Sequence, residues 1–271
     1  MPTINTNVNA LFAQNALTVN NRSLTKAMQQ LSTGSRVNSS GDDAAGLAIG
    51  TSMTAQIRGL NQAVRNANDG ISMLQTAEGA MVEQTNMLQR MRELAVQGTT
   101  ATYNSTQLGY LDTEFQALDT QINNIASNTK WNGVTVMASA TTQTFIVGSA
   151  GTESITVALA ATDNTTGLAT TSLAVSSAAS AAAAVTAIDT ALASISSARA
   201  KIGAGINQLT YAADNLTNVS QNLTASRSQI LDTDYATATT QLARSQIIQQ
   251  AATAMLAQAN QQPQTVLALL K

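Results

Sequence analysis

The sequence lacks cysteine and histidine entirely. This absence excludes a disulfide framework, Cys/His zinc sites, and catalysis that depends on a histidine base or a cysteine nucleophile. Charged residues are also scarce, at 10% of the chain, compared with about 25% in a typical soluble domain. The few carboxylates and lysines show no clustering that would indicate an active site. We therefore expect no enzymatic activity, no metal and no cofactor.

Aromatic residues make up only 3% of the chain. Because Phe, Tyr and Trp normally carry much of the buried area of a core, a thick globular core is excluded. Leucine, isoleucine, valine and alanine are sufficient for the thin core between long helices. The composition therefore favours packed helices over a globular domain.

The charge pattern gives no indication of a nucleic-acid or membrane partner. The formal net charge is −2 and lysines and arginines form no run, which argues against a basic nucleic-acid surface. No apolar stretch approaches the roughly 18 residues needed to cross a bilayer, so we expect no membrane insertion. The first residues lack the basic and apolar regions of a secretory signal. The absence of such a signal is usual for a cytosolic protein, but specialised export routes do not use one either.

Hydrophobic residues recur every seven positions in the C-terminal half. A strict heptad repeat predicts a left-handed coiled-coil contact between helices. This row, which we expect to form one seam of a helix bundle, consists of Ile188, Ile195, Ile202, Leu209, Leu216, Leu223 and Ile230.

A matching row in the N-terminal half includes Leu60, Leu74 and Leu88. It predicts one helix over residues 44–97, roughly 80 Å long at 1.5 Å per residue. A second row turns polar after Leu74, at Glu78 and Arg92, so either the buried stripe rotates there or the contact with the partner narrows. A third apolar pattern over residues 108–125 predicts a helix that folds back, which completes a bundle.

Both ends of the chain carry weaker apolar stripes. Neither has enough apolar surface to fold alone, so we expect each to need a partner. The stretch 31–43 interrupts the first stripe, and Asp42 or Asp43 can cap the long helix that follows. The residues expected at the core of an assembly are Ile4, Val8, Leu11, Leu24 and Leu31 at one end, and Leu242, Ile248, Met255, Leu256, Leu267 and Leu270 at the other.

The middle of the chain differs from both ends. Two β-like runs around a Gly-Ser-Ala-Gly turn predict a β-hairpin near residues 141–160. Residues 161–184 are rich in alanine, serine and threonine, and we expect a flexible surface loop that leads into a helix there. The predicted fold is mainly α, with a long-helix coiled-coil bundle, a small β-hairpin and a terminal helix pair.

Three ordered segments resemble signatures of the bacterial flagellin family. They are residues 31–49, reading LSTGSRVNSSGDDAAGLAI, residues 89–97, reading QRMRELAVQ, and residues 247–270, including LAQAN at 256–260. The resemblance covers roughly residues 1–137 and 185–271. It implies an inner terminal helical core called D0 (residues 1–43 and 235–271) and a bundle called D1 (residues 44–234). The short variable middle leaves no room for the outer domains of larger family members.

The apolar ends and the resemblance together imply assembly. A heterologous contact that does not close generates an open helical filament. The resemblance implies a structural subunit of the flagellar filament, a tubular polymer for swimming that lies outside the cell. The partners it implies are further copies of the chain, the filament cap and hook-junction proteins, the flagellar type III export apparatus and a cytosolic chaperone. Export then needs no cleaved signal peptide.

The resemblance also implies a host partner, Toll-like receptor 5. The residues expected to bind it are Gln89, Arg90, Leu94 and Glu114. The alternative is structural: Arg90 and Glu114 form salt bridges and Leu94 packs in a core.

Three other classes of protein remain as rivals. A hook–filament junction protein shares similar ends and length, although residues 31–49 and the terminal Leu-Leu-Lys favour a flagellin. A secreted coiled-coil effector or adhesin explains the heptads but not three ordered signatures. An enzyme is the weakest rival, because the charged residues form no cluster.

Overall fold

The structure, a computed structural model, describes residues 7–164 and 167–269, with side-chain burial up to Gln261. The chain forms two compact units. The first contains the residues up to Ala55 and from Asn222 onward, and the second contains residues 56–221. The described residues form five helices and two small antiparallel sheets. The architecture is mainly α, as the heptad patterns predicted.

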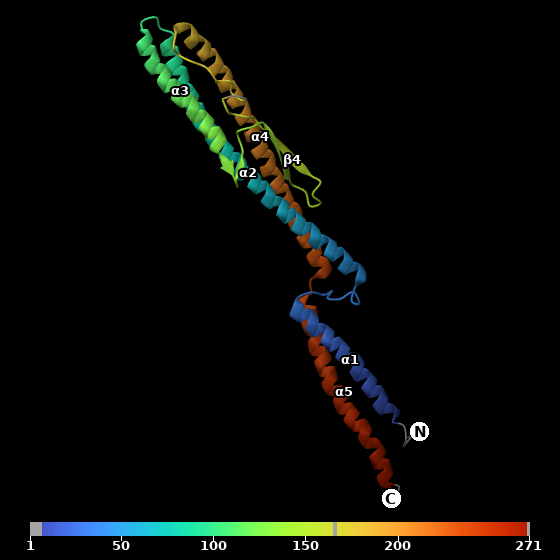
Figure 1. Ribbon diagram of the computed structural model, residues 1–271. Coiled ribbons are helices and arrows are strands. Elements are labelled where there is room, and N and C mark those ends of the chain that lie inside the picture. Colours follow the sequence, from blue (N-terminus) through green and yellow to red (C-terminus); the bar gives the residue numbers. More distant parts are fainter. Residues whose placement is uncertain (1–6, 165–166, 270–271) are drawn as a thin grey trace. The chain divides into compact units, whose positions relative to one another are not determined.

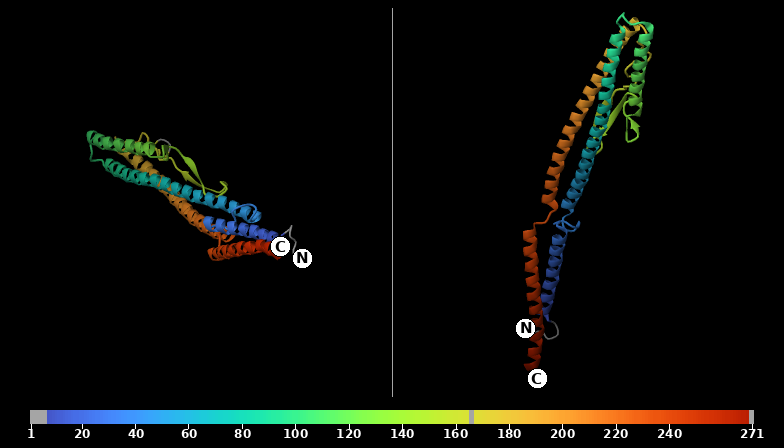
Figure 2. Two further views of the ribbon diagram at one scale, coloured as in Figure 1. Left: turned by 90° about the horizontal axis from the view of Figure 1, so that it is seen from below. Right: turned by 90° about the vertical axis from the view of Figure 1, so that its left-hand side faces the viewer.

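Two antiparallel helices make up most of the first unit. Helix α1 (Val8–Thr33) and helix α5 (Tyr235–Leu269) lie side by side along their length (Figures 1 and 2). Asn7 caps α1, because its side-chain oxygen accepts a hydrogen bond from the backbone N–H of Ala10 at 3.1 Å. Asp234 does the same for α5 with the N–H of Ala236 at 2.9 Å. Both caps satisfy amides that a helix start leaves without intrahelical partners.

Hydrogen bonds join the segment that follows α1 to the segment that precedes α5. We call this contact the linker bridge (residues 34–36 and 230–233). Ser35 and Asp232 pair as an antiparallel β-bridge. The backbone N–H of Arg36 donates to the carbonyl of Leu231 at 2.6 Å, and its guanidinium donates to the carbonyl of Ile230 at 2.7 Å. The linker bridge therefore provides hydrogen-bond donors for the carbonyls of Ile230 and Leu231, at the C-terminal end of the long helix that precedes residues 232–233.

The two aspartates before the long N-terminal helix have different roles. The Lys26 ammonium lies 2.8 Å from an Asp42 oxygen, and backbone N–H groups of Asn38 and Ser39 donate to the other oxygen. The hydrogen bond from Lys26, followed by the one from Asn38, lowers the pKa of Asp42 to about 2. Asp43 instead accepts from the N–H of Gly46 at 2.8 Å. Of the two candidates, Asp43 is the residue that caps the helix.

Three long helices form the second unit. Helix α2 (Ala44–Gly98), helix α3 (Ser105–Asn128) and helix α4 (Ala178–Leu231) pack alongside one another (Figure 1), and α2 and α4 also extend into the first unit. The long helix expected over 44–97 is therefore present. The chain reverses after α2, and Asn104 and Gln107 start α3 with a reciprocal capping box.

The heptad rows lie in the core of this unit. Leu223 and Ile230, near the end of α4, are half-buried. The other row members are at most 8% exposed: Leu60, Leu74, Leu88, Ile188, Ile195, Ile202, Leu209 and Leu216.

The apolar stripe of α2 changes position after Leu74. Ala77 and Met91 are fully buried there. The polar positions of the second row pair with α4 instead: Glu78 accepts from Arg199 at 2.8 Å and Arg92 donates to Asp189 at 2.7 Å. This arrangement favours the rotating stripe over a narrowing contact.

Two hairpins follow α3. The predicted hairpin is present as strands β3 (Thr141–Ile146) and β4 (Ser154–Leu159), which pair along their full length. A shorter one joins β1 (Lys130–Trp131) and β2 (Val134–Thr135) through Asn132 and Gly133, whose φ angles are 47° and 81°. The sequence analysis missed this turn, although Asn-Gly is a strong hairpin signal.

The segment 161–184 leads into a helix as expected, because α4 begins at Ala178 and the alanine-rich run at 181–184 favours helix. The described residues before α4 are held by hydrogen bonds, which the expectation of a flexible surface loop did not include. These residues hydrogen-bond to α3: a buried Asp119 carboxylate accepts from Asn164 at 2.8 Å and from Thr170 at 2.7 Å. Val175, whose N–H donates to Asp112 at 2.7 Å, is fully buried. Carboxylates of α3 therefore hold this segment in place.

The prediction that no stretch is apolar enough to cross a membrane is wrong when only helix length and hydropathy are considered. Among the described residues one helix, α4, has the length and the apolar content for a span, with a mean hydropathy of 1.5 over 18 residues. Its many alanines raise this average. Core helices of soluble proteins meet the same measure, so it is weak evidence for a membrane role. The buried row of α4 lies in the core of the second unit.

Candidate assembly interface

The contact between α1 and α5 is a heptad seam of small residues. Ala27 on α1 and Ala238 on α5 are buried, at 2% and 6% exposure. Small side chains let the two backbones approach closely along the pair. Half-buried leucines lie between them at the remaining seam positions, which are Leu17, Leu24 and Leu31 on α1 and Leu242 and Leu256 on α5.

The seam also contains buried amide side chains. Asn20 is only 8% exposed, and its side-chain nitrogen donates to the backbone carbonyl of Ser245 at 2.7 Å. Asn7 donates in the same way to the carbonyl of Ala259 at 2.8 Å. Buried polar groups need such partners, because an unpaired one costs about 1–3 kcal/mol. Hydrogen bonds therefore add to the alanines and leucines that hold the pair together.

Other large apolar side chains of the pair face outward. On α1, Leu11 is 66% exposed and Phe12 is 71% exposed, and on α5 Met255 is 67% exposed. The other large exposed hydrophobic residues of the two helices are Val8, Val19, Met28, Tyr235, Ile247 and Ile248. A folded monomer exposes single apolar residues routinely, but a contiguous set marks an interaction surface.

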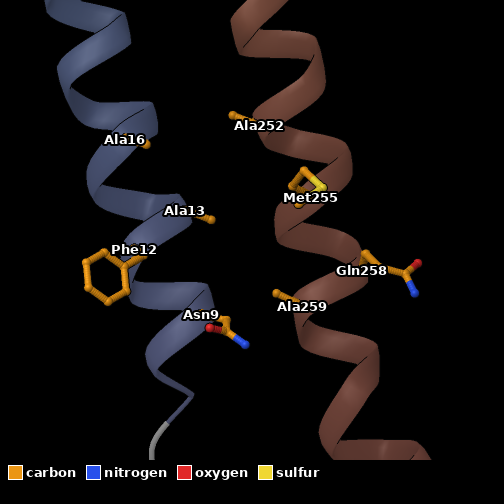
Figure 3. A pocket seen from close by; sticks show the side chains of 8 residues that line it. All are labelled: Asn9, Phe12, Ala13, Ala16, Ala252, Met255, Gln258 and Ala259. Carbon is orange, nitrogen blue, oxygen red and sulfur yellow. The ribbon is translucent and has the colours of Figure 1, made fainter.

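Four of these side chains, Phe12, Val19, Ile248 and Met255, line a groove on the helix pair, which we call the terminal groove. One part, of about 480 Å³, is lined by residues that include Phe12, Ala16, Ala252 and Met255. A second part, of about 560 Å³, shares Phe12 and is lined further by residues that include Val19 and Ile248. Figure 3 shows the alanines pointing into the gap between the helices, whereas the Phe12 ring points to the outer side of α1.

The residues expected to mediate assembly divide into two groups. Leu24, Leu31, Leu242 and Leu256 lie half-buried in the seam within one chain. Val8, Leu11, Ile248 and Met255 are exposed. Ile4 and Leu270 lie outside the described residues, as does the side chain of Leu267.

The sequence analysis missed Phe12 and Val19, which belong to the exposed set. The spacing of Val8, Phe12 and Val19, at i, i+4 and i+11, was the available signal for this second face of α1. It was missed because the seam leucines dominate the apolar pattern of that helix.

A second candidate surface lies on α2 and α3. Gln89 and Arg90 are exposed, and the Arg90 guanidinium donates to Glu114 at 2.9 Å and to Glu93 at 3.0 Å. These carboxylates raise the pKa of Arg90, Glu114 more than Glu93. Leu94 is only 1% exposed. Three of the four expected receptor-binding residues therefore share a surface, and Leu94 packs beneath it in the core.

No metal-binding cluster accompanies these surfaces in the described residues. Within residues 7–164 and 167–269, no group of three or more acidic, cysteine or histidine residues could hold a metal ion. Asp234 caps α5, and Asp232 accepts a hydrogen bond from Ser228 at 2.6 Å. Both aspartates thus have structural roles.

Comparison with protein families gives two matches that together span most of the chain. The bacterial flagellin N-terminal helical region matches residues 4–142, and the bacterial flagellin C-terminal helical region matches residues 185–270. The first segment contains all of α1, α2 and α3 and the β1–β2 hairpin, and the second contains most of α4 and all of α5. The segment between them includes β4 and the start of α4.

Full-length relatives agree with this match. The chain is 43% identical to a flagellin of Halalkalibacterium halodurans and 39% identical to a flagellin of Bacillus subtilis, in each case over 99% of both chains. It is 37% identical to a flagellar filament 33 kDa core protein of Treponema phagedenis, again over 99% of both chains.

Solved structures agree with the fold. The crystal structure of Bacillus cereus flagellin matches with a TM-score of 0.51 and 30% identity, over 60% of this chain and 94% of that chain. A hook-associated protein of Vibrio parahaemolyticus matches with a TM-score of 0.58 over 70% of this chain and 100% of that chain, but at 13% identity it supports the fold alone. The helix pair, the bundle and the sequence matches at both ends agree, and the chain belongs to the bacterial flagellin family.

Proposed function

We propose that this chain is the structural subunit of an extracellular flagellar filament, and that copies polymerise by burying the terminal groove of one subunit against its neighbours. The observation that carries this proposal is the outward placement of the large apolar side chains on α1 and α5, including Leu11, Phe12 and Met255. Each fully buried side chain of this kind contributes roughly 1.5–3 kcal/mol. A repeated contact of this type that does not close produces a helical polymer.

Charge placed in the terminal groove tests this proposal. Phe12→Asp and Met255→Asp should each abolish sedimentable polymer, because a charge buried between subunits is costly. Both residues are exposed, so the helix content of the monomer should not change. The matched control is Asn21→Asp, also exposed on α1 but outside the groove lining. Normal polymer from both groove variants would refute the proposal.

The remaining partners follow from membership of a filament family. The chain would leave the cell through the flagellar export apparatus, with its C-terminal apolar face masked by a cytosolic chaperone and without cleavage of a signal peptide. It would then add beneath a cap protein, on a filament that begins at hook-junction proteins. Intact mass of filament subunits tests the export route: they should have the same mass as the chain recovered from inside the cell, and loss of an N-terminal segment on export would contradict it.

A host receptor is a second candidate partner. Toll-like receptor 5 would bind the surface formed by Gln89, Arg90 and Glu114, while Leu94 supports that surface from the core. Arg90 is half-exposed, and its guanidinium forms ion pairs with Glu93 on α2 and Glu114 on α3. Arg90→Asp should lower receptor activation by monomer, and Arg58→Asp, an exposed arginine elsewhere on α2, should not. Equal activation by the Arg90 variant and the parent would refute the assignment.

A further inference from the structure

Packing alone leaves the register of α1 against α5 undetermined. Small residues recur every seven positions on the α5 side of the seam, at Ala238, Ser245, Ala252 and Ala259. A slip of α5 by one heptad would therefore place one small residue where another had been. In coiled coils, such degeneracy is resolved by a buried polar side chain at a seam position.

Asn7 and Asn20 supply polar contacts of this kind, with Asn20 buried and Asn7 half-buried. Asn20 lies in the seam between Leu17 and Leu24 and donates to the carbonyl of Ser245. Asn7 donates to the carbonyl of Ala259. Asn7 and Asn20 lie 13 positions apart in the sequence, and their acceptors on α5 lie 14 positions apart. Both bonds therefore obey one register, and both acceptors belong to the heptad row of small residues.

The asparagines by themselves do not select one heptad. A carbonyl beside a small side chain recurs every seven residues on α5, so a slip by a whole heptad can offer Asn20 an equivalent acceptor. If α5 slipped by other distances, the Asn20 side-chain amide would lie against Leu242 or Gln249. The asparagines thus limit the pair to steps of one heptad.

The linker bridge removes this remaining freedom. It ties residues 34–36, just after α1, to residues 230–233, just before α5, through Arg36 and the Ser35–Asp232 pair. The N–H of Thr233 also donates to the carbonyl of Gly34 at 2.9 Å. A heptad slip would move α5 by roughly 10 Å at 1.5 Å per residue, which these bonds cannot follow.

We infer that Asn7 and Asn20 fix the phase of the terminal helix pair, and that Arg36 and the linker bridge select the heptad. This inference rests on the proposed function for its consequence. Phe12 and Met255 both line the terminal groove, and a slip of one heptad would change which side chains of α1 and α5 line it together and break the apolar face that neighbouring subunits would bury. Arg36 is therefore a positioning residue for assembly, although it is not part of the groove lining.

The absence of cysteine allows the register to be measured directly. Ala27 follows Asn20 by seven residues and Ala238 precedes Ser245 by seven, so cysteines at 27 and 238 report the native register. Cysteines at 27 and 245 report a slip of one heptad, and cysteines at 27 and 242 report a shift of about one turn. Disulfides form only when the two Cβ atoms lie about 3.5–4.5 Å apart. A bond within one chain keeps monomer mass on a non-reducing gel, which distinguishes it from a bond between subunits.

Each reporter pair is combined with Arg36→Pro, which removes both Arg36 bonds of the bridge, and with the milder Arg36→Met, which removes only the guanidinium bond. The slipped 27/245 product should rise at least tenfold above the parent in Arg36→Pro and less in Arg36→Met, while the 27/242 product stays low. Adding Asn7→Leu and Asn20→Leu should raise the 27/242 product as well. The control Arg58→Met, an exposed arginine on α2, should match the parent.

A parent-like pattern in both Arg36 variants would overturn the role of the linker bridge. Equal 27/242 products with and without the asparagines would overturn their role in setting the phase. Sedimentation of the same samples tests the dependence on assembly separately. If the parent shows the native register but forms no polymer, the proposed function fails and the register assignment stands. If slipped chains polymerise as well as the parent, the register assignment stands but its importance for assembly is refuted.

Discussion

Replacing Phe12 by alanine should weaken the polymer while leaving the subunit intact. The Phe12 side chain is 71% exposed and makes little contact within its own chain. Substitutions at such positions usually change the free energy of unfolding by less than about 0.5 kcal/mol. The thermal midpoint and helix content of the monomer should therefore equal those of the parent.

The polymer should respond much more strongly. Complete burial of a phenylalanine side chain contributes about 1.5–3 kcal/mol. Because 71% of Phe12 is still exposed before assembly, polymerisation can gain about 1–2 kcal/mol per subunit from this residue. Each 1.4 kcal/mol corresponds to a tenfold change in an equilibrium constant. The critical concentration should therefore rise roughly 5- to 30-fold.

Sedimentation of polymer at a series of total concentrations measures this change. Tyr110→Ala is the matched control, because Tyr110 is also 71% exposed but lies on α3. An equal rise in both variants would show that any exposed aromatic residue contributes, and an unchanged critical concentration for Phe12→Ala would refute the role of the terminal groove. A large fall in monomer stability would contradict the outward placement of the ring.

Three further predictions concern stability of the subunit. Gly70→Ala should destabilise the bundle, because the added Cβ would lie 2.8 Å from the ring of Phe145 in the hairpin. Gly79→Ala, where the added Cβ has nothing within 4 Å, should stabilise the bundle by about 1 kcal/mol. Urea unfolding of both variants separates the effect of packing from that of helix propensity. Leu88→Ala, at a fully buried position, should cost about 2–5 kcal/mol in the same assay. Asp42, whose pKa is lowered to about 2 largely by Lys26, should stabilise the fold above about pH 4, and this contribution should disappear as the pH falls towards 2. Thermal midpoints measured over this range should therefore drop further for the parent than for Asp42→Asn, and equal slopes would contradict the assignment.

The long helices could be predicted from the sequence because their cores are periodic. The row from Ile188 to Ile230 repeats every seven residues without exception, and a period of this length has few other structural meanings. The β3–β4 hairpin was predictable for a similar local reason, since two β-like runs flank a glycine-containing turn. In both cases the information lies within a short stretch of chain.

The parts that could not be predicted depend on distant contacts. The segment before α4 is rich in small polar residues, as a flexible loop would be, yet Asp112 and Asp119 of α3 hold it by hydrogen bonds. The linker bridge is also invisible in sequence, because backbone groups of residues nearly 200 positions apart form it. The two faces of α1 could not be separated because Phe12 and the seam leucines are all simply apolar.

Electron microscopy of the purified chain tests the central claim most directly. The intact chain and a truncated chain lacking residues 1–33 and 240–271 would be compared before and after seeding or salting-out. Polymerisation through α1 and α5 predicts long uniform filaments from the intact chain and none from the truncated one. Filaments from both chains, or only small closed particles from the intact chain, would contradict assembly through the terminal helix pair.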